Sequence, residues 1–183
     1  MANETSSNTF LQRLLGAAAL DAAIYEEVEA DQTATIQACG VVLLMSLAAG
    51  IGARGLGGHT LGNVAFVSVV ALLVWATWAL VTFEIGTRLM PGPDTRSDVG
   101  ELLRTIGFST TPGLLLVLGV LPGLTVPVFA VAWALMLAAM IVAVRQALDY
   151  RSTGRAIAVC VLGWALALGI AVVLGVLFGP SVA

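Results

Sequence analysis

Acidic side chains gather in one short stretch of this chain, between Tyr25 and Asp31. On a helix, Glu26 and Glu29 share one face at a spacing of i,i+3, and Glu27 and Asp31 share another at i,i+4. Like charges at these spacings repel each other, so a compensating group is expected beside them. The stretch can be a solvated helix end, an arginine-paired cluster or a metal site, and the sequence leaves these three interpretations open.

The metal interpretation has the least support of the three. Di-metal carboxylate bundles use Glu-x-x-His in addition to single glutamates. Glu26 and Glu29 lack this histidine, and the only one in the chain, His59, is expected on the opposite side of the membrane. Glu84 joins Glu26 and Glu29 as a candidate metal ligand. No cofactor is predicted, and a metal ion is kept as a minor alternative.

Two further groups of polar residues lie beside apolar runs. Glu84 and Arg88 are i,i+4 neighbours at the end of a long uncharged stretch, and we interpret them as an ion pair at a helix end. The hydroxyl residues 109–111 come directly before Pro112. Because proline lacks an N–H, it should bend its helix, and these hydroxyls should bond the carbonyl groups that it frees.

The candidate structural or functional residues are therefore the acidic stretch, the charged helix ends and the surroundings of the proline. They are Asp21, Tyr25, Glu26, Glu29, Asp31, Glu84, Arg88, Arg104, Gly107, Pro112 and Arg145. The sequence contains no phosphate-binding glycine loop, HExxH, nucleophile elbow or CxxC motif. No catalytic residue is predicted, and the sequence favours a protein that is not an enzyme.

The elements that hold these residues are predicted to be membrane-spanning helices. Of the 183 residues, 59% are hydrophobic and 10% are charged, whereas about a quarter of a soluble domain is charged. The uncharged run between Arg104 and Arg145 has about 40 residues, enough for two spans of about 20 residues each. Pro122, Gly123 and Pro127 interrupt this run in the middle, so it predicts a hairpin of two helices.

The fold class predicted from these patterns is all-α, a polytopic membrane bundle of five transmembrane helices. The expected spans are residues 35–53, 63–86, 103–121, 126–148 and 156–178, in a membrane domain of residues 32–183. Residues 1–8 are expected to be a disordered polar terminus, and no cleavable signal peptide is expected. Residues 9–31 are expected to form one acidic amphipathic helix on the cytoplasmic side.

The arginines predict how the chain is oriented. All eight basic residues are arginines, and in the five-span arrangement only Arg54 lies on the side opposite the N-terminus. This asymmetry places the N-terminus in the cytoplasm and the C-terminus outside. We therefore expect Glu26 and Glu29 to pair with arginines of the cytoplasmic side. The arginines considered as partners are Arg88, Arg104, Arg145 and Arg155.

Composition also limits the partners. The net charge is −3, and no basic cluster is present, so nucleic-acid binding is not expected. Cys39 and Cys160 lie in apolar runs and are interpreted as small hydrophobic residues. The expected partners are membrane lipid, a second copy of the chain or another membrane protein. Small residues such as those of the stretch 48–52 allow such close helix contacts.

A glycine–aromatic–proline pattern occupies the start of the third expected span, Gly107-Phe108-Ser109-Thr110-Thr111-Pro112. It is similar to the Gly-Tyr-x-x-x-Pro element of the Yip family (Ypt/Rab-interacting proteins), with Phe108 in place of the tyrosine. The resemblance covers most of the chain, from about Leu14 to the fifth span, and points to the prokaryotic branch. It implies a five-span protein of the prokaryotic inner or plasma membrane.

In eukaryotes the same family implies vesicle trafficking, membrane shaping and contact with prenylated Rab GTPases. This chain lacks the long cytoplasmic N-terminus and the Asp-Leu-Tyr-Gly-Pro element of those proteins, so Rab binding is not expected. The leading interpretation is a non-enzymatic membrane protein that organises membrane components through lipid or helix contacts. The alternative is a small transporter or channel with a polar path at the cytoplasmic side. A carboxylate metal site in a membrane enzyme is a weaker alternative.

Overall fold

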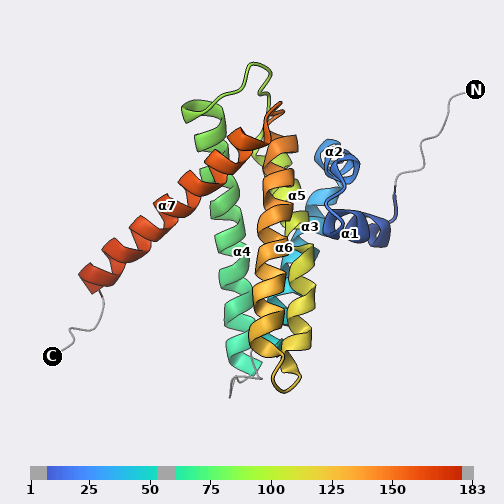
Figure 1. Ribbon diagram of the computed structural model, residues 1–183, viewed down its shortest axis with the longest axis vertical. Coiled ribbons are helices and arrows are strands. Elements are labelled where there is room, and N and C mark those ends of the chain that lie inside the picture. Colours follow the sequence, from blue (N-terminus) through green and yellow to red (C-terminus); the bar gives the residue numbers. More distant parts are fainter. Residues whose placement is uncertain (1–7, 53–60, 179–183) are drawn as a thin grey trace, which may run out of the picture.

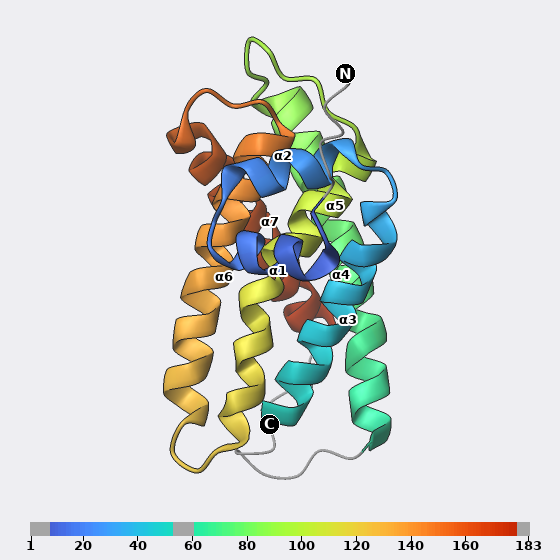
Figure 2. The ribbon, with the colours of Figure 1, turned by 90° about the vertical axis from the view of Figure 1, so that its right-hand side faces the viewer.

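The computed structural model describes residues 8–52 and 61–178 of the chain. Its long helices form a bundle from which the last one runs obliquely away, and two short helices lie across one flank of the bundle (Figures 1 and 2). The long helices are α3 (Ala34–Gly52), α4 (Leu61–Glu84), α5 (Val99–Ser109), α6 (Thr125–Ala147) and α7 (Thr153–Phe178). A π-helical turn, η2 (Ile85–Leu89), continues α4, and a 3₁₀-helix, η3 (Thr111–Val120), continues α5. The flanking helices are α1 (Phe10–Ala18) and α2 (Ala22–Ala30), which we call the N-terminal layer.

The predicted all-helical membrane fold is confirmed in its coarse form. Among the residues that the structure describes, three helical segments are long and apolar enough to cross a membrane, namely Ala34–Gly52, Val99–Val120 and Thr125–Ala147. Helices α4 and α7 have 24 and 26 residues, but the side chains of residues 61–71 and 167–178 lie outside the description. The count of five spans therefore stays a prediction.

The third expected span begins earlier than its apolar run because the chain supplies a strong start signal before it. Asp98 and Glu101 form a capping box, in which the Glu101 N–H donates to Asp98 Oδ1 at 2.9 Å. The Asp98 N–H donates in return to Glu101 Oε2 at 2.8 Å. These two bonds satisfy N–H groups that a helix start leaves free, so α5 begins at Val99 rather than at residue 103.

The acidic segment of residues 9–31 is two helices in the structure, whereas the sequence pattern predicts one. The break lies at Leu20, whose φ of 64° ends α1 in the left-handed conformation. Asp21 then accepts a hydrogen bond from the Ala23 N–H at 3.0 Å and caps the start of α2. A left-handed leucine costs about 1–2 kcal/mol, so the contacts that α2 gains by folding back must exceed this cost. Of the predicted disordered terminus, residues 1–7 lie outside the described residues.

The hydroxyl hydrogen bonds predicted beside Pro112 are present, and the helix geometry changes there. The α-helical geometry ends at Ser109 and continues as the 3₁₀-helix η3. Because Pro112 has no N–H for the carbonyl four residues earlier, that carbonyl, of Phe108, accepts from the Thr111 hydroxyl at 2.6 Å. The Ser109 hydroxyl likewise donates to the Ile106 carbonyl at 2.7 Å.

Close helix contacts in the bundle depend on glycines. A Cβ on Gly52 of α3 would collide with the Leu116 carbonyl oxygen of η3. A Cβ on Gly107 of α5 would lie 2.7 Å from the Ala38 Cβ and 3.2 Å from its Cα. The hairpin between η3 and α6 turns at Gly123, which has a φ of +77°, as the predicted break at residues 122–123 requires.

One end of the bundle carries α2 together with the connections 90–98 and 148–152, and we call it the arginine-rich end (Figure 1). The Thr95 hydroxyl donates to the Leu148 carbonyl at 2.9 Å, and Arg155 donates to the Pro91 carbonyl at 2.6 Å. The first bond ties the two connections together, and the second ties the connection 90–98 to the first turn of α7. The segments that the arginine pattern places on one side of the membrane are thus neighbours in space.

Candidate functional site

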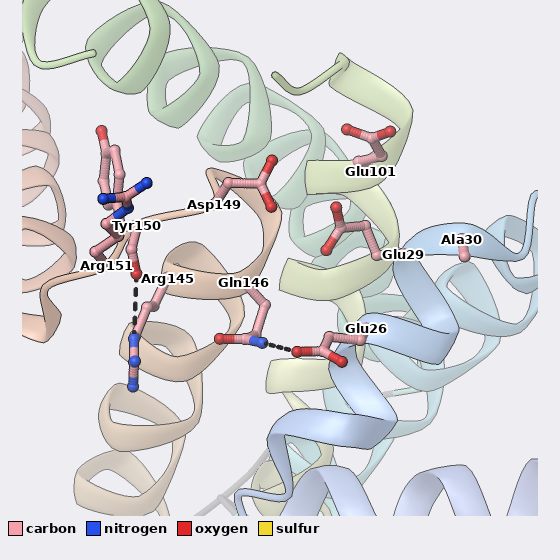
Figure 3. Close-up of a pocket in the computed structure, with 9 residues that line it drawn as sticks. All are labelled: Glu26, Glu29, Ala30, Glu101, Arg145, Gln146, Asp149, Tyr150 and Arg151. Carbon is pink, nitrogen blue, oxygen red and sulfur yellow. Dashed lines mark hydrogen bonds between the residues drawn. The ribbon is translucent and has the colours of Figure 1, made fainter. Parts of the chain in front are cut away.

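A polar cavity of about 440 Å³ opens at the arginine-rich end (Figure 3). Its walls come from α2, the start of α5, the end of α6 and the connection that follows α6. The lining residues are Glu26, Glu29, Ala30, Glu101, Arg145, Gln146, Asp149, Tyr150 and Arg151. Three predicted site residues, Glu26, Glu29 and Arg145, therefore meet here.

The carboxylates of Glu29 and Asp149 face each other across this cavity, and Glu101 lies beside them with its carboxylate turned away (Figure 3). Burial raises the pKa of Glu29 to about 7, and the neighbouring charges of Glu101, Asp149 and Glu26 add to this effect. Arg104 acts in the opposite direction and is outweighed. Glu29 consequently holds its proton up to near-neutral pH, unlike an ordinary surface glutamate.

Around this group the remaining polar residues of the cavity bond to protein atoms. Glu26 accepts from the Gln146 side-chain amide at 2.7 Å, which joins α2 to α6. Arg145 donates to the Tyr150 carbonyl at 3.3 Å. The buried Tyr150 hydroxyl lies 3.1 Å from the Gly86 carbonyl and 2.8 Å from that of Met90, so it fastens the cavity wall to η2.

The main charged centre of the N-terminal layer is Arg13, whose side chain is 3% exposed. Its guanidinium lies 2.9 Å from Glu27 Oε1 and 2.7 Å from Asp31 Oδ2. It also donates to Gln37 Oε1 at 3.0 Å, so one side chain joins α1, α2 and α3. Burial opposes its charge, but the hydrogen bonds to Asp31 and Glu27 prevail and raise the pKa of Arg13.

The same contacts stabilise the charged form of the two carboxylates. Burial of Glu27 works against its charge, but hydrogen bonds from Asn8 and Arg13 lower its pKa overall. Hydrogen bonds from Thr33 and Arg13 lower the pKa of Asp31. The compensating cation expected for the i,i+4 pair is therefore Arg13.

Arg104 performs a different task, because it binds backbone rather than carboxylate. Its guanidinium donates to the Val28 carbonyl at 3.2 Å and to the Glu29 carbonyl at 3.0 Å. These carbonyls belong to the last turn of α2, where free C=O groups and the negative end of the helix dipole favour a cation. Arg104 thus caps α2 and anchors it to α5.

Tyr25 closes the contact between the two short helices. It is fully buried, and its hydroxyl donates to the Ala17 carbonyl of α1 at 3.1 Å. The predicted site residues Asp21, Tyr25, Asp31, Arg104 and Gly107 therefore have structural positions around the layer and the bundle core. The sequence offers them from separate stretches of the chain, and a functional role for them stays a prediction.

Glu84 and Arg88 form the predicted ion pair at 3.0 Å, with side chains 48% and 73% exposed. Neither residue lines the polar cavity. Glu84 is thus separate from Glu26 and Glu29, and the three candidate metal ligands do not share one site. In the part of the chain that the structure describes, no three His, Cys, Asp or Glu side chains group closely enough to hold a metal ion, and His59 lies outside that part.

The expected partners of the acidic stretch are wrong in detail. Glu27 and Asp31 make the ion pairs, and they pair with Arg13 of the same segment rather than with an arginine of the bundle. On one continuous helix, Arg13 and Glu27 would lie about 21 Å apart at 1.5 Å per residue. The break at Leu20 brings them together, and the shared face of Glu27 and Asp31 was the available signal for a common cation.

The residues that line the cavity supply charged groups and hydrogen-bond donors and acceptors, and none of them is a serine, threonine, cysteine, histidine or lysine. A family model described as Yip1 domain matches residues 21–174 of the chain. No curated protein and no solved structure matches this chain. The match spans α2 to α7 and covers most of the sequence. The protein therefore belongs to the Yip1 family and is an integral membrane protein.

Proposed function

We propose that this protein organises the membrane around it through lipid and helix contacts and catalyses no reaction. Its family has no known catalytic role. The observation that carries the proposal is the orientation of α1. This helix turns Arg13 and Ala17 inward, with exposures of 2% and 0%, and turns Leu11 and Leu15 outward, each 64% exposed.

The position of α1 supports contact with lipid rather than water. Phe10 packs edge-on against Phe108, with ring centroids 6.4 Å apart, and Phe108 lies in the first half of the segment Val99–Val120, toward the arginine-rich end. A helix that lies across a span at this depth, with leucines outward, resembles an interfacial helix. We infer that α1 enters the cytoplasmic leaflet and displaces lipid there.

Charge placement supports a prokaryotic plasma-membrane protein with its N-terminus in the cytoplasm. The segments of the arginine-rich end would face the cytoplasm under the positive-inside rule. Exposed leucines on the long helices and close helix contacts at glycines favour association with a second copy or another membrane protein. The proposed partners are therefore a second copy of the chain or another membrane protein, together with membrane lipid.

A reconstitution experiment tests the role of α1. Wild type and Leu11→Ser/Leu15→Ser are placed in vesicles at equal protein-to-lipid ratios, and vesicle diameter and protein clustering are measured by electron microscopy and energy transfer. We expect the vesicle diameter or the protein clustering to change as the density of wild-type protein rises. With the variant, neither quantity should change. Ala19→Ser, an exposed substitution on the same segment, is the control. Identical behaviour of wild type and the leucine variant would rule out the proposal.

A transporter is the second candidate, because the polar cavity offers an entrance at the arginine-rich end. A polar path would have to continue between the spans. A second cavity, which lies between the spans, is lined mainly by tryptophan, methionine and aliphatic side chains, and such walls do not stabilise an ion. A vesicle flux assay decides, and we expect no ion flux above that of empty vesicles.

A further inference from the structure

All four tryptophans of the chain line one apolar cavity of about 330 Å³ between the spans. Trp75 and Trp78 come from α4, Trp133 from α6 and Trp164 from α7. The Trp164 ring lies 5.7 Å from Trp78 and 6.3 Å from Trp133, measured between centroids. Tryptophans of membrane proteins usually gather at the two interfaces. Their convergence on an internal cavity therefore requires another explanation.

The depth of the cavity follows from its other walls. Met45, Thr110 and Met136 line it, and each lies near the middle of one of the three segments that are apolar enough to cross a membrane. Met140 adds a third methionine. Methionine side chains are flexible and polarisable, and they are common on surfaces that bind apolar ligands of varied shape.

Water is a poor occupant of this cavity. The hydroxyls of Ser109 and Thr110, which are among its few polar groups, donate to carbonyls of their own helix at 2.7 Å each. An internal water needs two to four polar partners. Trp78 Nε1–H is buried without a hydrogen-bond partner among the described residues, so the local packing also leaves one donor without an acceptor.

The cavity is continuous with the lipid-facing surface. Three of its lining residues, Trp133, Leu137 and Trp164, are 52%, 45% and 47% exposed. Helix α7 runs obliquely away from the other long helices (Figure 1), which leaves this side of the bundle uncovered. At the depth of the spans, the surrounding medium is lipid hydrocarbon. An empty apolar cavity would forfeit the dispersion contacts of its walls.

We propose that this cavity binds one acyl chain of a membrane glycerolipid, which enters from the side past Trp133 and Trp164. The chain fills the space between the methionines and the indole rings. The inference depends only on the spans and is independent of the role of α1.

Fluorescence quenching by lipids with brominated acyl chains tests the proposal, because bromine quenches an indole on contact. Two single-tryptophan proteins are compared, each with the other three tryptophans replaced by phenylalanine. One keeps Trp75, which is 9% exposed inside the cavity, and the other keeps Trp133 at the rim. We expect brominated lipid to lower the fluorescence of both proteins by at least half relative to unbrominated lipid. Quenching of Trp133 without quenching of Trp75 would overturn the proposal.

A cavity-filling substitution separates entry into the cavity from contact at the surface. Val42 lines the cavity and is 1% exposed, so Val42→Phe should occupy part of the space. In the protein that keeps Trp75, this change should restore most of the fluorescence, whereas Trp133 should remain quenched. Undiminished quenching of Trp75 would overturn the proposal. If Val42→Phe does not fold, lipid retained by the purified wild type, measured by mass spectrometry, decides instead, and a lipid-free protein would overturn it.

Discussion

At the scale of single residues, two charged groups of the N-terminal layer behave in opposite ways. Arg13 is buried with two carboxylates and an amide around it, so each charge has a partner. Glu29 is partly buried among carboxylates, and Arg104 bonds its backbone carbonyl rather than its carboxylate. The first arrangement holds the layer together, and the second makes the stability of the layer depend on pH.

Arg13→Gln should destabilise the protein, because it leaves Glu27 and Asp31 without their cation. Breaking a buried ion pair costs about 3–5 kcal/mol of stability. We expect a loss of about 3 kcal/mol here, because these carboxylates stay 24% and 28% exposed. The loss should be largest above the ordinary pKa values of 4.5 and 3.8 and shrink as the pH falls below them. Melting in detergent measures it. Arg88→Gln, in the exposed pair, is the control and should change little.

Glu29→Gln should stabilise the protein at alkaline pH. The folded pKa of about 7 exceeds the ordinary value of 4.5, so the folded state holds a proton that the unfolded chain releases. Stability contributed by this group is therefore complete below about pH 4.5 and declines as the pH rises through about 7. Glutamine avoids this decline, so the variant should melt above wild type at pH 8 and equal it at pH 4. A lower melting temperature at pH 8 would instead indicate a structural ion pair.

At the scale of elements, glycine sets how closely α5 approaches α3. Gly107→Ala should destabilise the protein by about 1–3 kcal/mol, the usual cost of overpacking a core, because its Cβ would press on Ala38. Gly40, in α3, is the matched control, since a Cβ there meets nothing within 4 Å. Gly40→Ala should be neutral or stabilising by up to about 1 kcal/mol. Equal melting temperatures for the two variants would contradict this account of the contact.

The helix change at Pro112 allows a double-mutant test. Thr111→Val removes the hydroxyl that bonds the Phe108 carbonyl and should cost about 1–3 kcal/mol, the penalty of an unsatisfied buried group. In a Pro112→Ala background, a new N–H is available nearby, so the same change should cost clearly less. Unfolding free energies of the two single variants and the double variant measure this coupling. Strict additivity would show that the hydroxyl does not compensate for the proline.

Local signals explain which elements the sequence predicts well. The Pro112 geometry and the Pro122–Gly123 turn follow from the missing proline N–H and from the freedom of glycine, which are properties of single residues. The break at Leu20 carries no such signal, because leucine is rarely left-handed. Tertiary contacts of Tyr25 and Arg13 decide it. For the same reason the grouping of Glu29 with Glu101 and Asp149 depends on long-range packing that a sequence pattern does not encode.

At the scale of the whole molecule, charge asymmetry and apolar length predicted the arrangement better than they predicted the site. The arginine-bearing segments were expected on one side, and bonds such as Thr95 to Leu148 and Arg155 to Pro91 hold them together. Hydropathy cannot predict the tryptophan cavity, because a tryptophan in an apolar run has the same hydropathy whether it faces lipid, protein or a cavity. Side-chain direction around each helix supplies that information.

The membrane topology of the chain can be predicted from the same arginine asymmetry. In the five-span arrangement, seven of the eight basic residues would lie on the side of the N-terminus, with Arg54 as the exception. Five spans then place the C-terminus opposite the N-terminus. Reporter fusions after Ala183 and within residues 151–155 should therefore give opposite results, with the latter cytoplasmic. A fusion after Arg96 is the internal control and should agree with the one at 151–155, since Arg151 pairs with Asp94 at 2.7 Å. If the fusion after Ala183 and the fusion within residues 151–155 both report the cytoplasm, α7 does not cross the membrane and the five-span arrangement is wrong.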